Sequence, residues 1–290
     1  MIDGILEEYR IKIESRLDMF NALPGQPYDP VIDAARYSLL NGGKRIRPII
    51  LLEFYRLCGA DDDCAYNFAC AVEMVHTYSL IHDDLPCMDD DDMRRGKPSC
   101  HIRYGEGMAL LAGDDLLTEA FAVCAKTLGL PQERVVKAIS YLASAVGSSG
   151  MIGGQVIDTS VSVENEQMLF RMYSLKTCAL IRAAAVCGVI LAGGSDEQLK
   201  SAENYAENLG LAFQIIDDLL DVDGNSEVIG KPVGSDDKNG KNTAVRLLGE
   251  SRCRALANQY TENALLALNS FDGNTETLNA LTEMLLIREK

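Results

Sequence analysis

Two clusters of aspartates are the residues of this chain whose types and spacing are best suited to chemistry. The first lies in the segment 83–96, Asp-Asp-Leu-Pro-Cys-Met-Asp-Asp-Asp-Asp-Met-Arg-Arg-Gly, and the second in 214–221, Gln-Ile-Ile-Asp-Asp-Leu-Leu-Asp. Carboxylates this close repel one another unless a cation lies among them. Because Mg²⁺ binds oxygen and combines a few carboxylates with substrate phosphates, the clusters predict two acidic walls around Mg²⁺ and a diphosphate.

Helical spacing gives the first cluster a functional face. Four residues at i, i+3, i+7 and i+10 share it: Glu73, His76, Leu80 and Asp83. A polar stripe on an otherwise apolar helix costs free energy unless it lines a functional cavity. Pro86 ends the helix, so we expect Asp89 to turn back toward Asp83.

The second cluster is predicted to stay helical. Its polar residues follow i, i+3, i+4 and i+7: Gln214, Asp217, Asp218 and Asp221. Their neighbours are Leu, Ile and Phe, whereas a solvated face would be mixed with Lys. An EF-hand is excluded, because a loop beginning at Asp221 would have Ser226 in place of the sixth-position Gly and Pro232 in place of the final Glu.

Basic residues form matching anion sites. Lys44, Arg45 and Arg47 lie at a Gly-Gly turn that leads into a helix N-terminus, which favours anion binding. Further basic residues flank the two acidic clusters: Arg94, Arg95, Lys176 and Lys231. The net charge of −16 argues against a nucleic-acid or anionic-membrane surface. The local basic clusters therefore predict two separate diphosphate pockets.

The composition predicts an all-α protein with a single domain over residues 1–290. Hydrophobic residues make up 47% of the chain, aromatic residues only 6%, and no stretch alternates as a strand would. Apolar periodicity predicts helices over 5–23, 30–40, 61–81, 101–128, 132–146, 195–222, 244–268 and 275–287, with another beginning near Pro48. It also predicts two helices or one bent helix over 164–191. The segment 147–154 predicts a Gly/Ser-rich bend and 223–242 a mobile polar loop.

Cysteine usage and the chain ends favour a cytoplasmic protein without stable membrane association. Nine cysteines, none in a C-x-x-C pair, are typical of reduced thiols. The N-terminus lacks the apolar region of a signal peptide, and no prenylation box closes the chain. The longest apolar run, 178–194, is interrupted by Arg182 and is too short for a membrane span.

Together these segments resemble the bacterial-type trans-prenyl diphosphate synthases, the family of the farnesyl and geranylgeranyl diphosphate synthases. The segment 83–89 matches the family's first aspartate-rich motif in its form with a two-residue insertion, and 213–221 matches the second. The segments 42–48, 154–155, 176–177, 230–231 and 234–236 also match, in order and at similar spacing. Two places depart from the family pattern: Cys178 stands where Gly is common, and Ala244 and Val245 replace an aromatic-containing stretch.

The resemblance implies an isoprenoid-synthase-type helical bundle with a central active-site cavity, assembled as a homodimer. It implies a Mg²⁺-dependent condensation of isopentenyl diphosphate with dimethylallyl or geranyl diphosphate, with three Mg²⁺ ions when the allylic diphosphate is bound. It implies metal ligation by Asp83, Asp89 and Asp217, with Asp84, Asp218 and Asp221 as supporting or water-mediated ligands.

The resemblance also assigns residues to the two substrates. It implies contacts to the allylic diphosphate by Arg94, Lys176 and Lys231, and to isopentenyl diphosphate, in a metal-free pocket, by Lys44, Arg47, His76 and Arg95. Thr177 and Gln214 would face the developing allylic cation, and with Lys176 and Asp84 they form the expected catalytic set.

Product length depends, by resemblance, on how deep the allylic pocket runs below the first motif. Tyr78 lies five residues before Asp83, about 7.5 Å along a helix at about 1.5 Å per residue. A bulky ring there resembles the farnesyl (C15) type, which we favour, although Tyr78 could simply pack in the core. The small Ser79 leaves a gap that would suit a geranylgeranyl (C20) product.

Three other functions fit less well. A terpene cyclase handles one diphosphate and needs no second cation site, and its second metal motif is normally an Asn/Ser/Glu set. A non-catalytic subunit of a heteromeric prenyl synthase tends to lose one acidic motif, whereas both are complete here. A purely structural acidic helical protein would not need either pocket.

Overall fold

The computed structural model describes residues 2–20, 25–223 and 243–286. The chain divides into two compact units, the first made of residues 1–52 and 62–139 and the second of residues 53–61 and 140–290. Residues 224–242 of the predicted mobile loop, including Lys231, lie outside the described residues.

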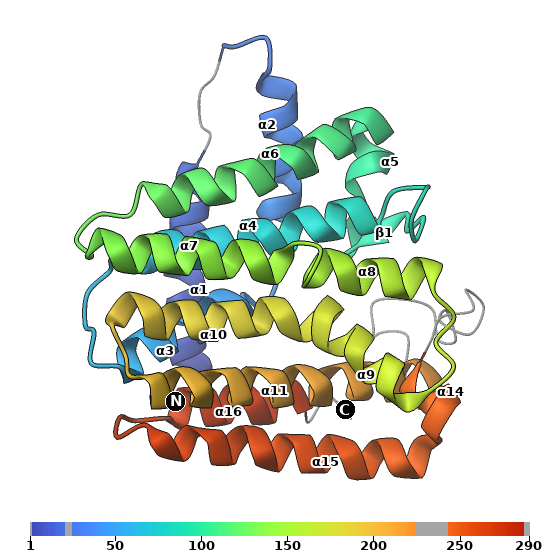
Figure 1. The fold of residues 1–290 in the computed structure, drawn as a ribbon. Coiled ribbons are helices and arrows are strands. Elements are labelled where there is room, and N and C mark those ends of the chain that lie inside the picture. The colour runs from blue at the N-terminus through green and yellow to red at the C-terminus, as the bar shows by residue number, and fades with distance from the viewer. Residues whose placement is uncertain (1, 21–24, 224–242, 287–290) are drawn as a thin grey trace. The chain divides into compact units, whose positions relative to one another are not determined.

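The first unit is built around α4 (Tyr66–Asp83), which packs against α6 (Glu106–Ala125), while α2 packs against both (Figure 1). Twelve of the eighteen residues of α4 are buried, Glu73 among them, so its polar side chains must find partners within the protein. The remaining elements of this unit are α1 (Ile2–Met19), α2 (Asp29–Leu39), the hairpin strands β1 (Met93–Arg94) and β2 (Lys97–Pro98), and α5 (Cys100–Tyr104). Helices α3 (Ile46–Leu57) and α7 (Gln132–Val146) begin in the first unit and end in the second.

The second unit is built around α11 (Asp196–Asp223), which lies between α10 (Ala179–Ala192) and α15 (Glu250–Ala267) (Figure 1). A π-helical turn, η1 (Ser174–Cys178), joins α9 (Glu166–Tyr173) to α10. The remaining elements are α8 (Met151–Ser160), α14 (Ala244–Leu248), the 3₁₀ turn η2 (Leu268–Ser270) and α16 (Glu276–Leu286).

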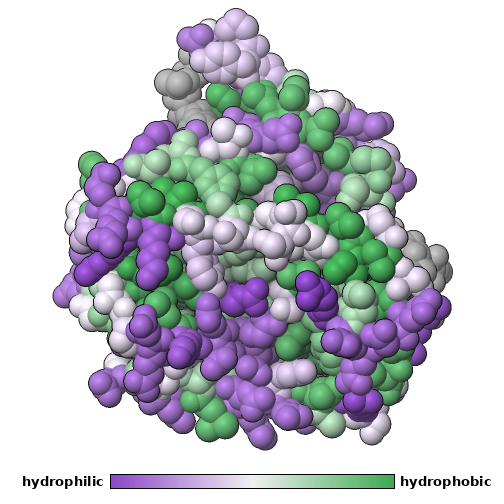
Figure 2. Space-filling model, in the orientation of Figure 1, coloured by the Kyte–Doolittle hydropathy of each residue, from purple (hydrophilic) through white to green (hydrophobic). Residues whose placement is uncertain are grey.

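Two stretches are long and apolar enough to cross a membrane by length and composition alone. They are 166–192, which is mostly buried within the protein, and 132–160, which is less buried. A mostly buried apolar stretch is typical of a core helix, and α10 has that character because nearly all of its residues are buried. On the face drawn in Figure 2, hydrophobic and hydrophilic residues are interspersed over the parts of the chain that are coloured.

The all-α prediction is confirmed, and the strands described are only the two-residue pair β1 and β2. Two predicted boundaries are wrong. The expected helices 101–128 and 244–268 are each split at a glycine, Gly105 and Gly249, whose φ angles are +86° and +80°. A positive φ interrupts a right-handed helix, and glycine adopts it at little cost. The predicted bend over 147–154 is shorter than expected, because α8 already begins at Met151.

Candidate functional site

The first aspartate-rich motif turns back on itself after α4 ends at Asp83. The backbone N–H of Asp89 donates to the carbonyl of Asp83 at 2.9 Å, and Asp90 closes the turn with a φ of +53°. This return confirms the effect expected of Pro86. Asp83 and Asp89 are both partly exposed, whereas Asp84 is only 2% exposed. The backbone of Asp89 is therefore brought back to Asp83, with both side chains partly exposed, while the side chain of Asp84 is buried.

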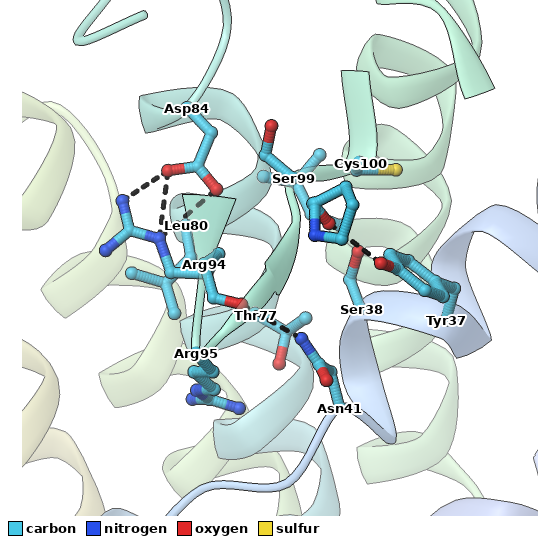
Figure 3. Close-up of a pocket in the computed structure, with 12 residues that line it drawn as sticks. Tyr37, Ser38, Asn41, Thr77, Leu80, Asp84, Arg94, Arg95, Ser99 and Cys100 are labelled. Atoms are coloured by element: carbon cyan, nitrogen blue, oxygen red, sulfur yellow. Dashed lines mark hydrogen bonds and ion pairs between the residues drawn. The ribbon is translucent and has the colours of Figure 1, made fainter. Parts of the chain in front are cut away.

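The buried Asp84 is held by Arg94 (Figure 3). Arg94 donates from Nε to Asp84 Oδ1 at 2.9 Å and from Nη2 to the same oxygen, and Nη2 also donates to Asp91 at 3.0 Å. Burial opposes the charge of Arg94, but the hydrogen bond and charges of these aspartates outweigh it and raise the pKa of Arg94. Asp84 is thus held within the protein, and the predicted allylic-diphosphate ligand Arg94 is paired within the motif.

A short hairpin presents Arg94 and Arg95. Strands β1 and β2 pair in antiparallel register, with Arg94 opposite Lys97. The two residues between them, Arg95 and Gly96, have φ angles of +52° and +74°, the positive values of a type I′ turn. The sequence analysis missed this hairpin, because two-residue strands are too short to show alternation. The Arg95-Gly96 pair that joins the two strands was the signal from which a hairpin turn could have been predicted.

The predicted isopentenyl diphosphate ligands lie in the first unit on three segments. Arg47 Nη1 lies 3.3 Å from His76 Nε2, which joins the start of α3 to α4. Burial and the positive charge of Arg47 and other nearby arginines lower the pKa of His76 well below its usual range, so the ring is neutral and accepts this hydrogen bond through Nε2. Arg95 donates from Nη1 to the carbonyl of Gly42. Lys44, two residues after Gly42, is exposed.

A pocket lies behind the hairpin, lined by residues of α2, α4 and α5 (Figure 3). The space between these side chains is about 320 Å³ when the solvent at its opening is counted. Two side chains at the end of α2 and just after it hold the hairpin. Tyr37 donates its hydroxyl to the carbonyl of Pro98 at 2.8 Å, and Asn41 donates to the carbonyl of Arg94 at 3.2 Å. The end of α2 therefore positions the two arginines.

The residues predicted to set product length are packed into α4. Tyr78 is 6% exposed, and its ring meets the His82 ring edge to face at a centroid distance of 5.7 Å. Its hydroxyl has no hydrogen-bond partner among the described residues, and burial raises its pKa to about 12. Ser79 donates its hydroxyl to the carbonyl of His76 at 2.9 Å. The apolar ring of Tyr78 is thus fixed five residues before the first motif.

The second motif keeps its predicted helical spacing along α11. Asp218 is 3% exposed and accepts three hydrogen bonds: from the hydroxyl of Tyr173, from the backbone N–H of Ala244 at 2.6 Å, and from Gln214 Nε2 at 3.1 Å. Asp221 is also buried, and Asp217 is partly exposed. As in the first motif, one of two adjacent aspartates is held within the protein.

The π-helical turn η1 carries Lys176 and Thr177 beside this motif. Thr177 donates its hydroxyl to Gln214 Oε1 at 2.8 Å, so the two residues predicted to face the allylic cation lie together. Lys176 donates to the Asp158 carboxylate on α8. A Cβ on Gly154 would come within 2.2 Å of the backbone nitrogen of Lys176, so only glycine allows α8 this close. Single π-turns often mark functional positions within helices.

Sequence reasoning missed three partners of the predicted residues: Asp91, Asp158 and Tyr173. Asp91 belongs to the acidic run and was assigned no role of its own. Asp158 lies one helical turn after Gly154, a spacing that could have indicated it. Tyr173 gave no local signal, because its contact with Asp218 depends on tertiary packing. Lys231 lies outside the described residues.

The described residues contain no group of three or more His, Cys, Asp or Glu side chains already arranged around one point as metal ligands. The donors of the two motifs are nevertheless carboxylate oxygens, the ligands that Mg²⁺ prefers. Mg²⁺ usually keeps several waters and takes substrate phosphates, so it does not need a complete protein cage. The donor set therefore fits Mg²⁺ bound together with a diphosphate.

Comparison with known proteins agrees with this site. The family model described as Polyprenyl synthetase matches residues 29–282. Geranylgeranyl pyrophosphate synthase 3, a chloroplastic protein of Arabidopsis thaliana, is 46% identical over 251 residues, which cover 83% of this chain and 69% of that protein. The apo structure of an FPP/GFPP synthase from Zymomonas mobilis is 31% identical, has a TM-score of 0.88 and covers 98% of both chains.

A geranyltransferase from Helicobacter pylori, solved with magnesium and isoprenyl diphosphate, is 31% identical, has a TM-score of 0.83 and covers 98% of this chain and 95% of that chain. The all-α fold and the paired aspartate-rich motifs define the class as a prenyl synthase, a prenyltransferase. The chain belongs to the polyprenyl synthetase family, among the trans-prenyl diphosphate synthases.

Proposed function

We propose that this protein condenses isopentenyl diphosphate with dimethylallyl or geranyl diphosphate and releases farnesyl diphosphate, the C15 product, and diphosphate. One observation carries most weight. Helix α4 leads from His76, beside the cation cluster of Arg47 and Arg95, into the carboxylate loop of Asp83 and Asp89. The cations suit a diphosphate bound without metal, and the carboxylates suit one bound through Mg²⁺. A condensation of two diphosphates requires both kinds of site.

Mg²⁺, when bound, neutralises charge on the departing diphosphate. Asp83 and Asp89 in the first motif and Asp217 in the second are the ligands that we propose, and the family suggests three ions with the allylic diphosphate. Asp221 would support the second motif. A magnesium-bound structure of the Helicobacter pylori relative supports the choice of ion.

In the proposed reaction, the allylic C–O bond breaks and the electron pair leaves with the diphosphate. Arg94, Lys176 and Lys231 hold that leaving group, while Thr177 and Gln214 place oxygens near the cation. The isopentenyl double bond, held by the cation cluster, attacks the allylic carbon and forms the new C–C bond. The released diphosphate then takes the proton that restores a double bond. The site must exclude water, because water would react with the allylic cation.

The C15 product is supported by the buried ring of Tyr78, five residues before Asp83. A C20 product is the second candidate. It is supported by the small Ser79 and by the geranylgeranyl synthase name of the Arabidopsis relative. The FPP/GFPP name of the Zymomonas relative includes the C15 product.

Assembly and compartment belong to the same proposal. We expect one polyprenyl synthase domain over 1–290 and a homodimer, for which exposed apolar side chains on α5 and α6, Ile102, Leu110 and Leu111, offer contact area. All nine cysteines are free, which fits a reducing compartment such as the cytoplasm. The Arabidopsis relative is chloroplastic, so a plastid is the competing location.

The test is a product-length assay with purified protein, Mg²⁺, geranyl diphosphate and excess isopentenyl diphosphate, with the dephosphorylated products sized by mass. A dominant C15 alcohol is expected for the wild type, and Tyr78→Ala should shift it to C20 or longer. A dominant C20 alcohol from the wild type would keep the condensation and reject the Tyr78 limit. No condensation would favour a non-catalytic subunit of a heteromeric synthase.

A further inference from the structure

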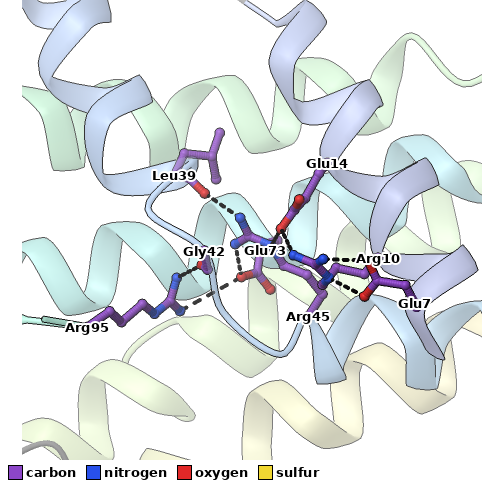
Figure 4. Close-up of polar contacts among 8 residues, drawn as sticks. All are labelled: Glu7, Arg10, Glu14, Leu39, Gly42, Arg45, Glu73 and Arg95. Carbon is purple, nitrogen blue, oxygen red and sulfur yellow. Dashed lines mark hydrogen bonds and ion pairs between the residues drawn. The ribbon is translucent and has the colours of Figure 1, made fainter. Parts of the chain in front are cut away.

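The side chain of Arg45, in the basic turn over 42–48, is buried and lies against Glu73 and the carbonyl of Leu39 (Figure 4). The turn is left-handed at three positions, with φ angles of +70° at Gly42, +125° at Gly43 and +50° at Arg45. A non-glycine residue adopts a positive φ at an energetic cost, which persists only where surrounding contacts impose it. The sequence analysis counted Arg45 among the cations available to an anion, and the structure corrects this, because its side chain is fully buried.

The contacts that impose this conformation come from three helices. Arg45 Nη1 donates to Glu73 Oε1 on α4 at 2.7 Å, and Nη2 donates to the carbonyl of Leu39 at the end of α2 at 2.8 Å. Its Nε lies 3.5 Å from Glu14 Oε1 on α1. One guanidinium therefore fixes the turn to α1, α2 and α4 together. Its planar fork is what allows several directional bonds at once.

A buried ion pair of this kind is weak support for stability, because desolvation of both charges offsets their attraction. Replacing such a pair by apolar residues is often neutral. The pair between Arg45 and Glu73 is therefore better explained by the geometry that it imposes than by the stability that it adds.

The same carboxylate also faces Arg95. Arg95 Nη2 lies 4.0 Å from Glu73 Oε1, and its Nη1 donates to the carbonyl of Gly42. A Cβ on Gly43 would lie 2.8 Å from the guanidinium carbon of Arg95, so the arginine is packed directly on the turn. Glu73 is thus shared by the buried Arg45 and by Arg95, which has been assigned to the isopentenyl diphosphate pocket.

We propose that Arg45 is a positioning residue for the diphosphate of isopentenyl diphosphate. It fixes the backbone between Lys44 and Arg47 and, through Glu73, the place of Arg95, so that these cations converge before the ligand arrives. The inference rests on the proposed function. Because preorganisation lowers the cost of binding, loss of this fork weakens affinity for that diphosphate without removing a ligand.

The experiment measures binding of isopentenyl diphosphate by calorimetry in the presence of EDTA, together with KM for both substrates and the melting temperature. Arg45→Lys keeps the charge and loses the fork, and it should raise the Kd for isopentenyl diphosphate about tenfold while KM for geranyl diphosphate changes less than twofold. The matched control is Arg36→Lys. Arg36 likewise binds a carboxylate and backbone carbonyls, those of Asp18 and Phe20, but contacts no proposed ligand. The Kd of the Arg36→Lys variant for isopentenyl diphosphate should remain within twofold of the wild-type value.

A second variant separates positioning from folding. Arg45→Met combined with Glu73→Met removes both charges of the buried pair, so it should fold with a melting temperature near that of the wild type and still bind isopentenyl diphosphate at least tenfold more weakly. Wild-type affinity in this folded variant, or an equal rise of both KM values in Arg45→Lys, would overturn the inference. So would a wild type that does not bind isopentenyl diphosphate in EDTA. A wild type that binds it in an Arg45-dependent way but condenses no primer would overturn the proposed function alone.

Discussion

The two aspartate-rich motifs hold their buried aspartates with different partners. In the first motif Asp84 is bound by Arg94, which carries a full charge. In the second motif Asp218 is bound by a tyrosine hydroxyl, a glutamine amide and a backbone N–H, all of them neutral. In both motifs the neighbouring aspartate, Asp83 or Asp217, is partly exposed. In each motif, an adjacent pair of aspartates thus divides into one that is held within the protein and one that is partly exposed.

The difference between the partners concerns charge. Arg94 neutralises part of the first motif from within, whereas the donors that the described residues supply to Asp218 are neutral. We therefore expect the stability of the second motif to depend on the tyrosine proton that solvates its buried carboxylate. This contrast leads to predictions that separate the exposed aspartates from the buried ones, and the first motif from the second.

The largest effect is expected for the exposed aspartate of the first motif. Asp83→Asn should lower kcat by about 100-fold or more, because a proposed metal ligand is lost at the site of developing charge, with an unchanged melting temperature. Asp84→Asn is the matched control. It should mainly raise KM for geranyl diphosphate by releasing Arg94. Equal losses of kcat at equal stability in the two variants would contradict the division.

For the buried aspartate of the second motif, the expected effect is on stability. Asp218→Ala leaves several buried donors without an acceptor, so it should lower the free energy of unfolding by about 3 kcal/mol. Tyr173→Phe removes one of these hydrogen bonds and should cost about 1 kcal/mol. Urea unfolding followed by circular dichroism measures both. A cost below 1 kcal/mol for Asp218→Ala would mean that its contacts do not hold the second motif.

Alkaline pH should separate the motifs further. Burial, with the charge and hydrogen bond of Asp218, raises the pKa of Tyr173 above its ordinary value. Because the folded state then holds this proton more tightly than the unfolded chain, the stability from this group is complete below pH ~10 and falls as pH rises further, by up to about 1.4 kcal/mol per pH unit.

The unfolding free energy of Tyr173→Phe should therefore fall less than that of the wild type between pH 9 and 11. Arg94 stays charged in this range because its pKa is raised, so the difference between wild type and Asp84→Asn should stay constant. Parallel curves for wild type and Tyr173→Phe would be evidence against a protonated Tyr173 that solvates Asp218.

The smallest effect expected is that of salt. Arg94 is partly exposed, so its ion pair with Asp84 should weaken as ions screen it. The stability difference between wild type and Asp84→Asn should shrink by about 0.5 kcal/mol between 0.05 and 1 M NaCl. The difference for Tyr173→Phe should not change, because its hydroxyl is neutral. If the difference for Tyr173→Phe shrank with salt and that for Asp84→Asn did not, the ionic partner would belong to the second motif and the account would be wrong.

Local patterns predicted most of the helices and the spacing of the polar residues along α4 and α11, because both follow from 3.6-residue periodicity. The return of Asp89 to Asp83 followed from Pro86 in the same way. The breaks at Gly105 and Gly249 were missed, since a glycine within an apolar pattern does not reveal the sign of its φ angle.

The partners of the predicted site residues were beyond reach for a different reason. Asp158 and Tyr173 contact Lys176 and Asp218 across tertiary packing. The spacing from Gly154 could have pointed to Asp158, but nothing in its own segment indicates the contact of Tyr173. The inward turn of Arg45 likewise depends on Glu73, which lies 28 residues away. Sequence patterns thus indicated clusters of charged residues suited to diphosphate chemistry, but not which of several neighbouring charges is buried against a partner and which is exposed.

The most direct test of this division is a Mg²⁺ titration of condensation activity in Asp217→Asn and Asp218→Asn, with melting temperatures measured in parallel. We expect Asp217→Asn to raise the half-saturating Mg²⁺ concentration at least tenfold at an unchanged melting temperature. Asp218→Asn should lower the melting temperature and leave that concentration within about threefold of the wild type. The opposite result, with the buried aspartate controlling the Mg²⁺ requirement and the exposed one controlling stability, would contradict the account.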